Sequence, residues 1–308
     1  MYSAACGAFG FGNGCVMEIS SLVQVVASGL LMGLLYALIA VGLSLVFGLM
    51  NVVNFAHGEF LMVAMYSVFG LWLATALDPV LLGPIVAALM FAFGALVYMG
   101  IVRFAMRSKS NVMMVQIFST FGLAIFLQGV AQYFFSPDYR SIPDSWLGGK
   151  TADVAGVFLP IPQLVGGLVS ILVFVALYFL MSRTDFGKAL EATREDQGAV
   201  ALVGINRNRI FALGWGLGAA LVGLAGAVLA TYYYIYPHVG VPFALISYVV
   251  VALGGFGSIF GALAAGMIVG VVEAVTTMML PASMKMISVY SLYLLVVFLR
   301  PKGLFGKL

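Results

Sequence analysis

Four polar side chains interrupt an apolar stretch near the N-terminus and are the first candidates for chemistry: Asn51, Asn54, His57 and Glu59. Polar and ionisable groups at membrane depth are costly and usually face a bundle interior or a wet cavity, so a translocation path is one explanation. Structural hydrogen bonding at a helix break explains the same residues equally well. Asn51, Asn54 and Gly58 are three and four residues apart, and we expect them to share one helical face.

A second interruption lies near the C-terminus, and its members are small: Gly254, Gly255, Gly257 and Ser258. Two interrupted segments in corresponding parts of a transporter indicate a site lined by open backbone and half-helix ends. We therefore expect this segment to match the first break and to line the same path. Close packing of helices through small residues is the competing explanation.

The sequence predicts no enzyme chemistry. It contains neither the GxSxG nor the HExxH motif, and no nucleophile, base and acid converge. The tripeptide beginning at Gly149 ends in Lys150 and Thr151, but Asp144 replaces the first glycine that a phosphate-binding loop needs. We expect no cofactor and no nucleic acid.

Metal binding is not expected either. Only two histidines, His57 and His238, occur, and no carboxylate cluster accompanies them. Cys6 and Cys15 lie in a glycine-rich tail, and two cysteines define no disulfide framework. Glu273, the lone carboxylate of its hydrophobic segment, is interpreted as the partner of a polar group on another helix.

The elements that must position these residues are membrane helices. The 308 residues are 63% hydrophobic and 8% charged, with a mean hydropathy of +1.14. Uncharged runs of about 20 residues recur along the chain, which is the length of one helical crossing. They lack the alternation of barrel strands. We predict an all-α polytopic transmembrane bundle of about 8–10 spans, forming a single domain over residues 1–308.

Two of the hydrophobic blocks, residues 20–50 and 242–280, are too long for one crossing, so each holds two spans or a span and a half-helix. Lys and Arg accumulate in cytoplasmic loops. We therefore place three basic clusters on that side, and residues 136–162 form an external loop. The clusters comprise Arg103, Arg107 and Lys109; Arg183, Lys188, Arg194, Arg207 and Arg209; and Arg300, Lys302 and Lys307.

The predicted cytoplasmic loop, residues 183–209, holds five basic and four acidic side chains. This near-neutral balance favours contact with a protein over a lipid-binding patch. Apolar spacing of three and four predicts one or two short amphipathic helices over residues 185–203, and Gly204 is placed to end them. A solvated connector between two spans is the plain alternative.

The order of four segments resembles permease subunits of branched-chain amino-acid ABC transporters, of the high-affinity leucine, isoleucine and valine uptake type. The segments are residues 46–62 (VFGLMNVVNFAHGEFLM), 183–230, 249–266 (VVVALGGFGSIFGALAAG) and 300–306 (RPKGLFG). The NFAHGE motif is similar to that of the first of two paired permeases. The resemblance implies a location in the inner (cytoplasmic) membrane, a second permease subunit, ATP-binding subunits and an external substrate-binding protein.

The resemblance also implies that the cytoplasmic loop couples to the ATPase. The residues similar to a coupling helix are Glu191, Ala192, Arg194, Glu195, Asp196, Ala201 and Gly204. The chain departs from the better-known loop by lacking a downstream Ile-x-Leu-Pro. An ion-coupled secondary transporter, or a channel for small polar solutes, is the alternative; such a carrier would work without an ATPase.

Overall fold

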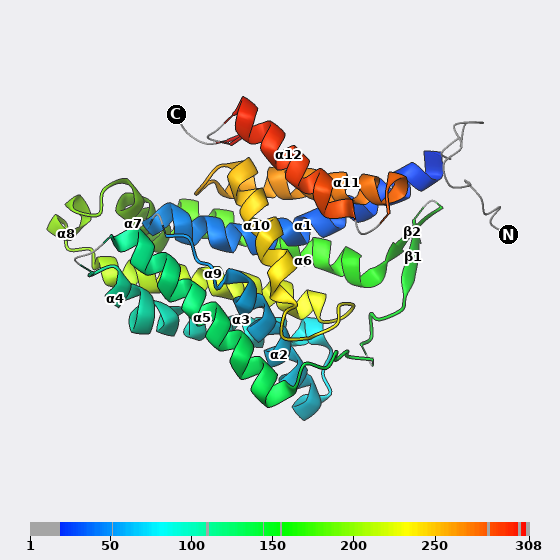
Figure 1. Cartoon of the computed structure of the whole chain (residues 1–308), viewed down its shortest axis with the longest axis horizontal. Coiled ribbons are helices and arrows are strands. Elements are labelled where there is room, and N and C mark those ends of the chain that lie inside the picture. Colours follow the sequence, from blue (N-terminus) through cyan, green and yellow to red (C-terminus); the bar gives the residue numbers. More distant parts are fainter. Residues whose placement is uncertain are drawn as a thin grey trace.

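The computed structural model describes residues 19–50, 52–108, 111–143, 145–154, 156–281, 284–300 and 303–305. Helices form nearly all of the regular structure of this part of the chain (Figure 1), which confirms the all-α prediction. Seven residues discussed above lie outside the described residues: Cys6, Cys15, Asn51, Lys109, Asp144, Lys302 and Lys307.

Within the described ranges, seven helices are long and apolar enough to cross a membrane. They are α1 (Ile19–Met50), α2 (His57–Thr75), α3 (Pro79–Val97), α5 (Val112–Phe135), α6 (Ile161–Arg183), α9 (Arg207–Leu229) and α11 (Ile259–Met279). Two shorter apolar helices are α10 (Gly240–Gly254) and α12 (Lys285–Leu299). The predicted block 20–50 is one helix, and the block 242–280 is divided into α10 and α11.

The remaining elements are short. A π-helical turn, η1 (Tyr98–Val102), and α4 (Arg103–Ala105) continue α3, while α7 (Asp185–Glu195) and α8 (Ala199–Leu202) follow α6. The strands β1 (Thr151–Val154) and β2 (Val157–Pro160) pair antiparallel, with Thr151 opposite Pro160. This hairpin lies in the predicted external loop, immediately before α6.

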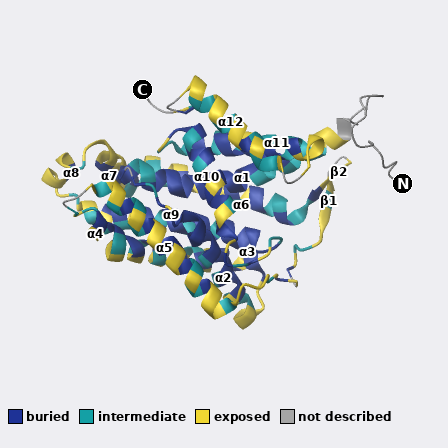
Figure 2. Cartoon of the chain, viewed as in Figure 1, coloured by how far each residue is buried: buried dark blue, intermediate teal, exposed yellow. Residues whose placement is uncertain are grey.

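The core is built around α1 and α9, which are buried along most of their length (Figure 2). Small residues allow the helices to approach closely. A Cβ added to Gly33 of α1 would lie 2.6 Å from the Gly266 carbonyl oxygen of α11, and one added to Gly218 of α9 would lie 2.9 Å from that of Gly42. Contacts of this kind are typical of membrane helix pairs.

The two ends of the bundle differ. Figure 1 shows α7 and α8 at one end of the long axis and the β1–β2 hairpin at the other; these are called the α7 end and the hairpin end. Arg103 and Arg107 share a pocket with Arg207, and the Leu304 N–H donates to the Leu253 carbonyl at 2.7 Å, beside α10's last turn. The described members of the three basic clusters thus lie at the α7 end.

An ion pair joins the last two helices. Lys285 Nζ of α12 lies 2.7 Å from Glu273 Oε1 of α11, and Glu273 is buried. The predicted partner of this lone carboxylate is therefore a cation on the neighbouring helix.

Candidate translocation path and coupling site

The helix α2 begins inside the bundle. After α1 ends at Met50, residues 52–56 return along it without helical structure, and Nε2 of His57 donates to the Ile39 carbonyl of α1 at 2.9 Å. At about 1.5 Å per residue, Ile39 lies about 15 Å along the helix from Leu49 at the α7 end. The first turn of α2 is therefore buried at depth.

The helix α10 begins at the same depth. A Cβ on Gly240 would overlap the backbone of Gly58, and one on Gly58 would lie 2.7 Å from the Ala244 Cβ. We call this contact between Gly58 and Gly240 the central junction. From it, α2 runs toward the hairpin end, where Asp78 Oδ2 accepts from the Trp146 N–H at 2.8 Å, and α10 runs toward the α7 end.

Two helix N-termini, each carrying a partial positive charge, thus meet inside the protein. The hydrophobic block predicted from residue 242 begins two residues after the start of α10, but the sequence analysis did not place that start inside the bundle. The first interrupted segment is therefore paired with the start of α10, and not with residues 254–258 as we expected. This is a correction to the predicted pairing of the two breaks.

Asn54 organises the turn between α1 and α2. It is 1% exposed, its Oδ1 accepts from the Ala56 N–H at 3.1 Å, and its carbonyl accepts from the Tyr248 hydroxyl of α10 at 2.8 Å. The residue lies in the turn rather than in a helix, so the prediction that it shares a helical face with Gly58 is wrong. A side chain that bonds the backbone two residues onward favours a turn over a helix.

Glu59 is buried in the first turn of α2, where a negative charge complements the helix dipole. Its Oε1 accepts from Gln128 Nε2 of α5 at 2.7 Å, while Oε2 has no hydrogen-bond partner among the described residues. Together with His57 and Asn54, it places polar groups from α2 and from the preceding turn around the central junction.

The helix α5 supplies polar partners that sequence reasoning missed. Thr120 Oγ1 accepts from the Phe55 N–H at 3.3 Å, and Gln132 Nε2 lies 2.9 Å from His238 Nε2. With Gln116 and Gln128, these residues recur at multiples of four along one otherwise apolar helix. That spacing is the signal that would have found a polar stripe facing the break.

The turn between α10 and α11, residues 255–258, lies at the α7 end. Gly255 (φ 95°) and Gly257 (φ 78°) have positive φ, which glycine adopts without a Cβ penalty. Gly254 packs against the backbone of Gly261, and Ser258 caps α11 by accepting from the Gly261 N–H at 3.0 Å. The four small residues therefore form a helix-hairpin tip.

The amphipathic helices predicted over residues 185–203 are present as α7 and α8. Thr184 caps α7 by accepting from the Gly187 N–H at 3.1 Å. Gly204 (φ 80°) ends α8 as predicted: the Gly204 and Ile205 N–H groups donate to the carbonyls of Ala201 and Val200, the pattern of a Schellman motif.

Asp196 caps the start of α8. Its Oδ1 accepts from the Gly198 N–H at 2.7 Å and from the Ala199 N–H at 3.0 Å. The Ala199 bond, followed by the Gly198 bond, lowers the pKa of the Asp196 carboxyl below its ordinary value. The side chain predicted for ATPase coupling thus also holds the turn between α7 and α8.

The helix α7 presents two faces. The inward face lines a cavity with Gly187, Leu190, Glu191 and Arg194. Positions at three- and four-residue intervals on the other side form an outward face, which is exposed: Asp185, Lys188, Ala192 and Glu195. All four of these predicted coupling residues are exposed, but Glu191 and Arg194 line the cavity, whereas Ala192 and Glu195 lie on the outward face.

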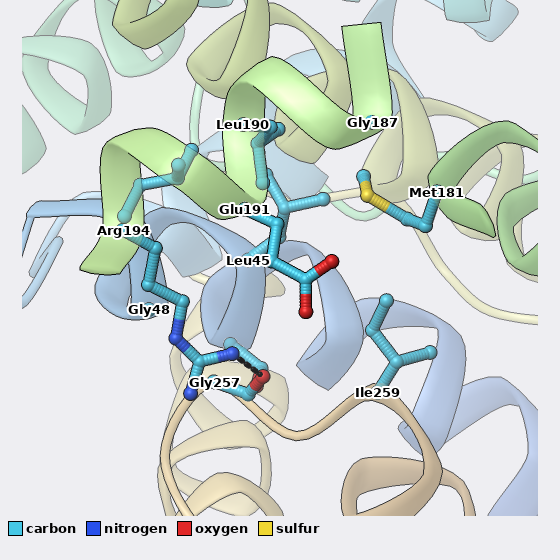
Figure 3. A pocket seen from close by; sticks show the side chains of 11 residues that line it. Leu45, Gly48, Met181, Gly187, Leu190, Glu191, Arg194, Gly257 and Ile259 are labelled. Atoms are coloured by element: carbon cyan, nitrogen blue, oxygen red, sulfur yellow. Dashed lines mark hydrogen bonds between the residues drawn. The ribbon is translucent and has the colours of Figure 1, made fainter. Parts of the chain in front are cut away.

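Arg194 links α7 to the α10–α11 turn. Its Nη1 donates to the Gly257 carbonyl at 3.0 Å (Figure 3), and a Cβ on Gly257 would lie 2.9 Å from Nη2. Two residues beyond α7, Gln197 Nε2 donates to the Leu49 carbonyl of α1 at 3.4 Å. The segment that ends α7 is thus bonded to the ends of both α1 and α10.

The cavity between α7, α1 and the α10–α11 turn has a volume of about 130 Å³. Ser44, Leu45, Gly48 and Leu49 of α1 form one wall, and Met181 and Ile259 come from α6 and α11. Figure 3 shows Glu191 and Arg194 reaching into this space from α7. The described residues contain no group of three or more His, Cys, Asp and Glu that could hold a metal ion.

The model of the branched-chain amino acid transport system permease component family matches residues 25–299. The chain belongs to this family. No solved structure matches this chain.

Curated relatives agree along nearly the full length. The permease protein BraD of the Pseudomonas aeruginosa high-affinity branched-chain amino acid transport system is 32% identical over 300 residues, covering 94% of this chain and 97% of the relative. LivH of the corresponding system of Escherichia coli K12 is 30% identical over 295 residues, covering 92% and 95%. A probable branched-chain amino acid permease LivH of Methanocaldococcus jannaschii is 28% identical over 251 residues.

Family membership and the seven long apolar helices of the described residues make this chain a multi-pass membrane permease. The recognition of the family from its four sequence segments is confirmed.

Proposed function

We propose that this permease is one of two paired subunits that form the path of an ATP-driven importer for branched-chain amino acids in the cytoplasmic membrane. The relatives named above are permeases of branched-chain amino acid transport systems, which supports the substrate class. A separate binding protein delivers the amino acid from outside, and separate subunits hydrolyse ATP. In this orientation, the α7 end faces the cytoplasm and the hairpin end faces outward.

One observation carries the coupling part of this proposal: α7 is exposed on one face and hydrogen-bonded to the α10–α11 turn on the other. The outward face, with Ala192 and Glu195, seats in a groove of the ATPase. Asp196, Ala201 and Gly204 extend that contact along α8. Charged pairs at such an interface select the partner, and small residues let the surfaces approach.

Arg194 then passes movement of α7 to the α10–α11 turn. Since α10 runs from this turn to the central junction, displacement at the α7 end reaches the two helix N-termini at depth. The path in this proposal follows the junction, with Asn54, His57 and Glu59 beside it and Gly254, Gly255, Gly257 and Ser258 at its inner mouth. Asn51 belongs to the same path by its place in the sequence.

The test is charge reversal on the outward face. Glu195→Lys combined with Asp196→Lys should abolish ATP-dependent uptake and co-purification of the ATPase, while the permease still folds and inserts. Retained co-purification and uptake in the double variant would remove α7 from the docking surface. Lys150→Glu, at the hairpin end, is the matched control and should leave both unchanged.

The buried carboxylate of Glu59 keeps an ion-coupled carrier as the second candidate, because such carriers use intramembrane carboxylates. The two candidates differ in their energy source. Uptake by the permease pair in vesicles that carry an ion gradient but no ATPase would favour the carrier.

A further inference from the structure

The cavity beneath α7 contains both signs of charge. Figure 3 shows the Glu191 carboxylate within it and the Arg194 guanidinium beside Gly257. Glu191 makes no hydrogen bond or ion pair with the described residues, and the structure gives no ion pair between the two side chains. Arg194 commits one N–H to the Gly257 carbonyl. The guanidinium is a planar fork that binds carboxylates in bidentate fashion, and a fork that includes Nη1 exchanges the Gly257 carbonyl for a carboxylate oxygen.

A buried hydroxyl lies on the opposite wall. Ser44 of α1 is 0% exposed and lines the cavity, and its Oγ has no hydrogen-bond partner among the described residues. Buried polar groups in folded proteins are nearly always paired. An unpaired hydroxyl next to a cavity therefore points, independently of the two charges, to a polar ligand.

The rest of the wall is apolar, with Leu45, Leu49, Leu190 and Ile259. At about 30 Å³ per water in the liquid, a cavity of about 130 Å³ holds roughly four waters, which is room for the charged groups of a small amino acid. A wider space of about 290 Å³ shares Glu191, Arg194 and Ile259 with it and provides an approach. Sugars and phosphates are strongly hydrated and fit an apolar wall poorly.

We propose that this cavity binds the zwitterion of an apolar amino acid from the cytoplasmic side, with Glu191 receiving the ammonium group and Arg194 the carboxylate. The inference rests on the proposed function, since it makes the imported product a regulator of its own uptake. The apolar wall receives the side chain of the amino acid, and Ser44 donates to its carboxylate.

Binding of the amino acid in this cavity weakens the coupling between α7 and the membrane helices. A carboxylate competes with the Gly257 carbonyl for the Arg194 guanidinium, and the ionised acceptor forms the stronger bond. Occupancy therefore breaks the link between α7 and the α10–α11 turn. Uptake slows when the internal amino acid accumulates, although the ATPase remains docked on the outward face.

The test uses proteoliposomes of the complete complex, with ATP and unlabelled leucine inside and the binding protein with labelled leucine outside. Initial uptake is measured as a fraction of the same variant's rate with no internal leucine. The wild type should lose most of its uptake at high internal leucine. In Glu191→Gln, the half-inhibiting leucine concentration should rise roughly ten-fold or more, as expected for losing one charged partner.

Asp185→Asn is the matched control, because it removes a carboxylate from the outward face of the same helix; its sensitivity to internal leucine should equal that of the wild type. Uptake that ignores internal leucine in the wild type overturns the inference, and so does equal inhibition in Glu191→Gln. If ATP-driven uptake is absent even with no internal leucine, the proposed function has failed instead.

A direct binding measurement distinguishes failure of this inference from failure of the proposed function. The assembled complex in detergent, without binding protein or ATP, should bind labelled leucine, and Glu191→Gln should weaken that binding. Isoamylamine lacks the carboxylate and 4-methylpentanoate lacks the ammonium group, so neither should displace leucine efficiently. Equal displacement by either analogue, or unchanged binding in Glu191→Gln, contradicts a zwitterion site.

Discussion

Two turns of this permease have opposite designs. The turn before α2, residues 52–56, lies at depth and its polar groups are bonded within the chain: Asn54 to Ala56 and Tyr248, and His57 to Ile39. The turn between α10 and α11 lies at the α7 end, has two positive-φ glycines, and is held by a side chain from α7. Both flank α10, one near its start and one at its end.

The difference indicates that the first turn stays fixed and the second turn moves. Close backbone contact and short hydrogen bonds make the deep turn costly to rearrange, since each buried group would lose its partner. The glycine turn packs on Phe47 and Gly48 of α1, but its side-chain hydrogen bond comes from an exposed arginine, so moving it breaks fewer buried hydrogen bonds. The helix α10 thus has a fixed start at the central junction and a movable end at the α10–α11 turn. Coupling to an ATPase requires such an element.

The largest expected effect comes from breaking the fixed end. Gly240→Val puts a side chain into the backbone of Gly58, and overpacking of this kind costs about 1–3 kcal/mol or more. We expect the yield of folded permease and its thermal midpoint in detergent to fall sharply. Gly70→Ala is the matched control: nothing lies within 4 Å of a Cβ there, so the midpoint should not fall. An undisturbed Gly240→Val protein would disprove the close contact.

An intermediate effect is expected at Asn54. Asn54→Leu removes the acceptor for the Ala56 N–H, and an unpaired buried donor costs about 1–3 kcal/mol. We predict slower uptake with the ATPase still bound, measured by transport and co-purification on the same sample. Asn54→Asp keeps an acceptor at that position and should retain more activity. Wild-type uptake by Asn54→Leu would make the turn irrelevant to transport.

The smallest effect is expected at the movable end. Asp196→Ala removes the side chain that caps α8, so amide exchange over residues 198–204 should accelerate while the central junction keeps its protection. The folded pKa of Asp196 is lowered, so its contribution is complete above the unfolded pKa and is lost as the pH falls through the folded pKa. Lowering the pH of the wild type should therefore accelerate amide exchange over residues 198–204 as the variant does. Faster exchange at the central junction would show that the effect of Asp196 is not local.

The sequence predicted the features that have a local cause. Hydropathy gave the all-α membrane bundle, the spacing over residues 185–203 gave α7 and α8, and Gly204 marked where α8 ends. The clustering of Lys and Arg correctly grouped segments that the structure brings to one end. Each of these rests on residues close together in the chain, which is why a single sequence suffices.

Most of the predictions that failed depend on distant residues. Asn54 looked helical from its spacing to Gly58, but the contact of its carbonyl with Tyr248 of α10 supports a turn. Gly240 was missed because only Gly58, far away in sequence, explains it. The inward direction of Arg194 depends on where the Gly257 carbonyl lies, and periodicity cannot supply that.

The coupling ratio of Arg194→Ala tests the central claim most directly. In the reconstituted complex, leucine transported and ATP hydrolysed are measured together, with Arg209→Ala as the control at the same end. A hydrogen bond to a charged group contributes roughly 1.5–3 kcal/mol, so Arg194→Ala should transport about 10-fold less leucine per ATP, with hydrolysis retained. An unchanged ratio would contradict transmission through Arg194 and the α10–α11 turn.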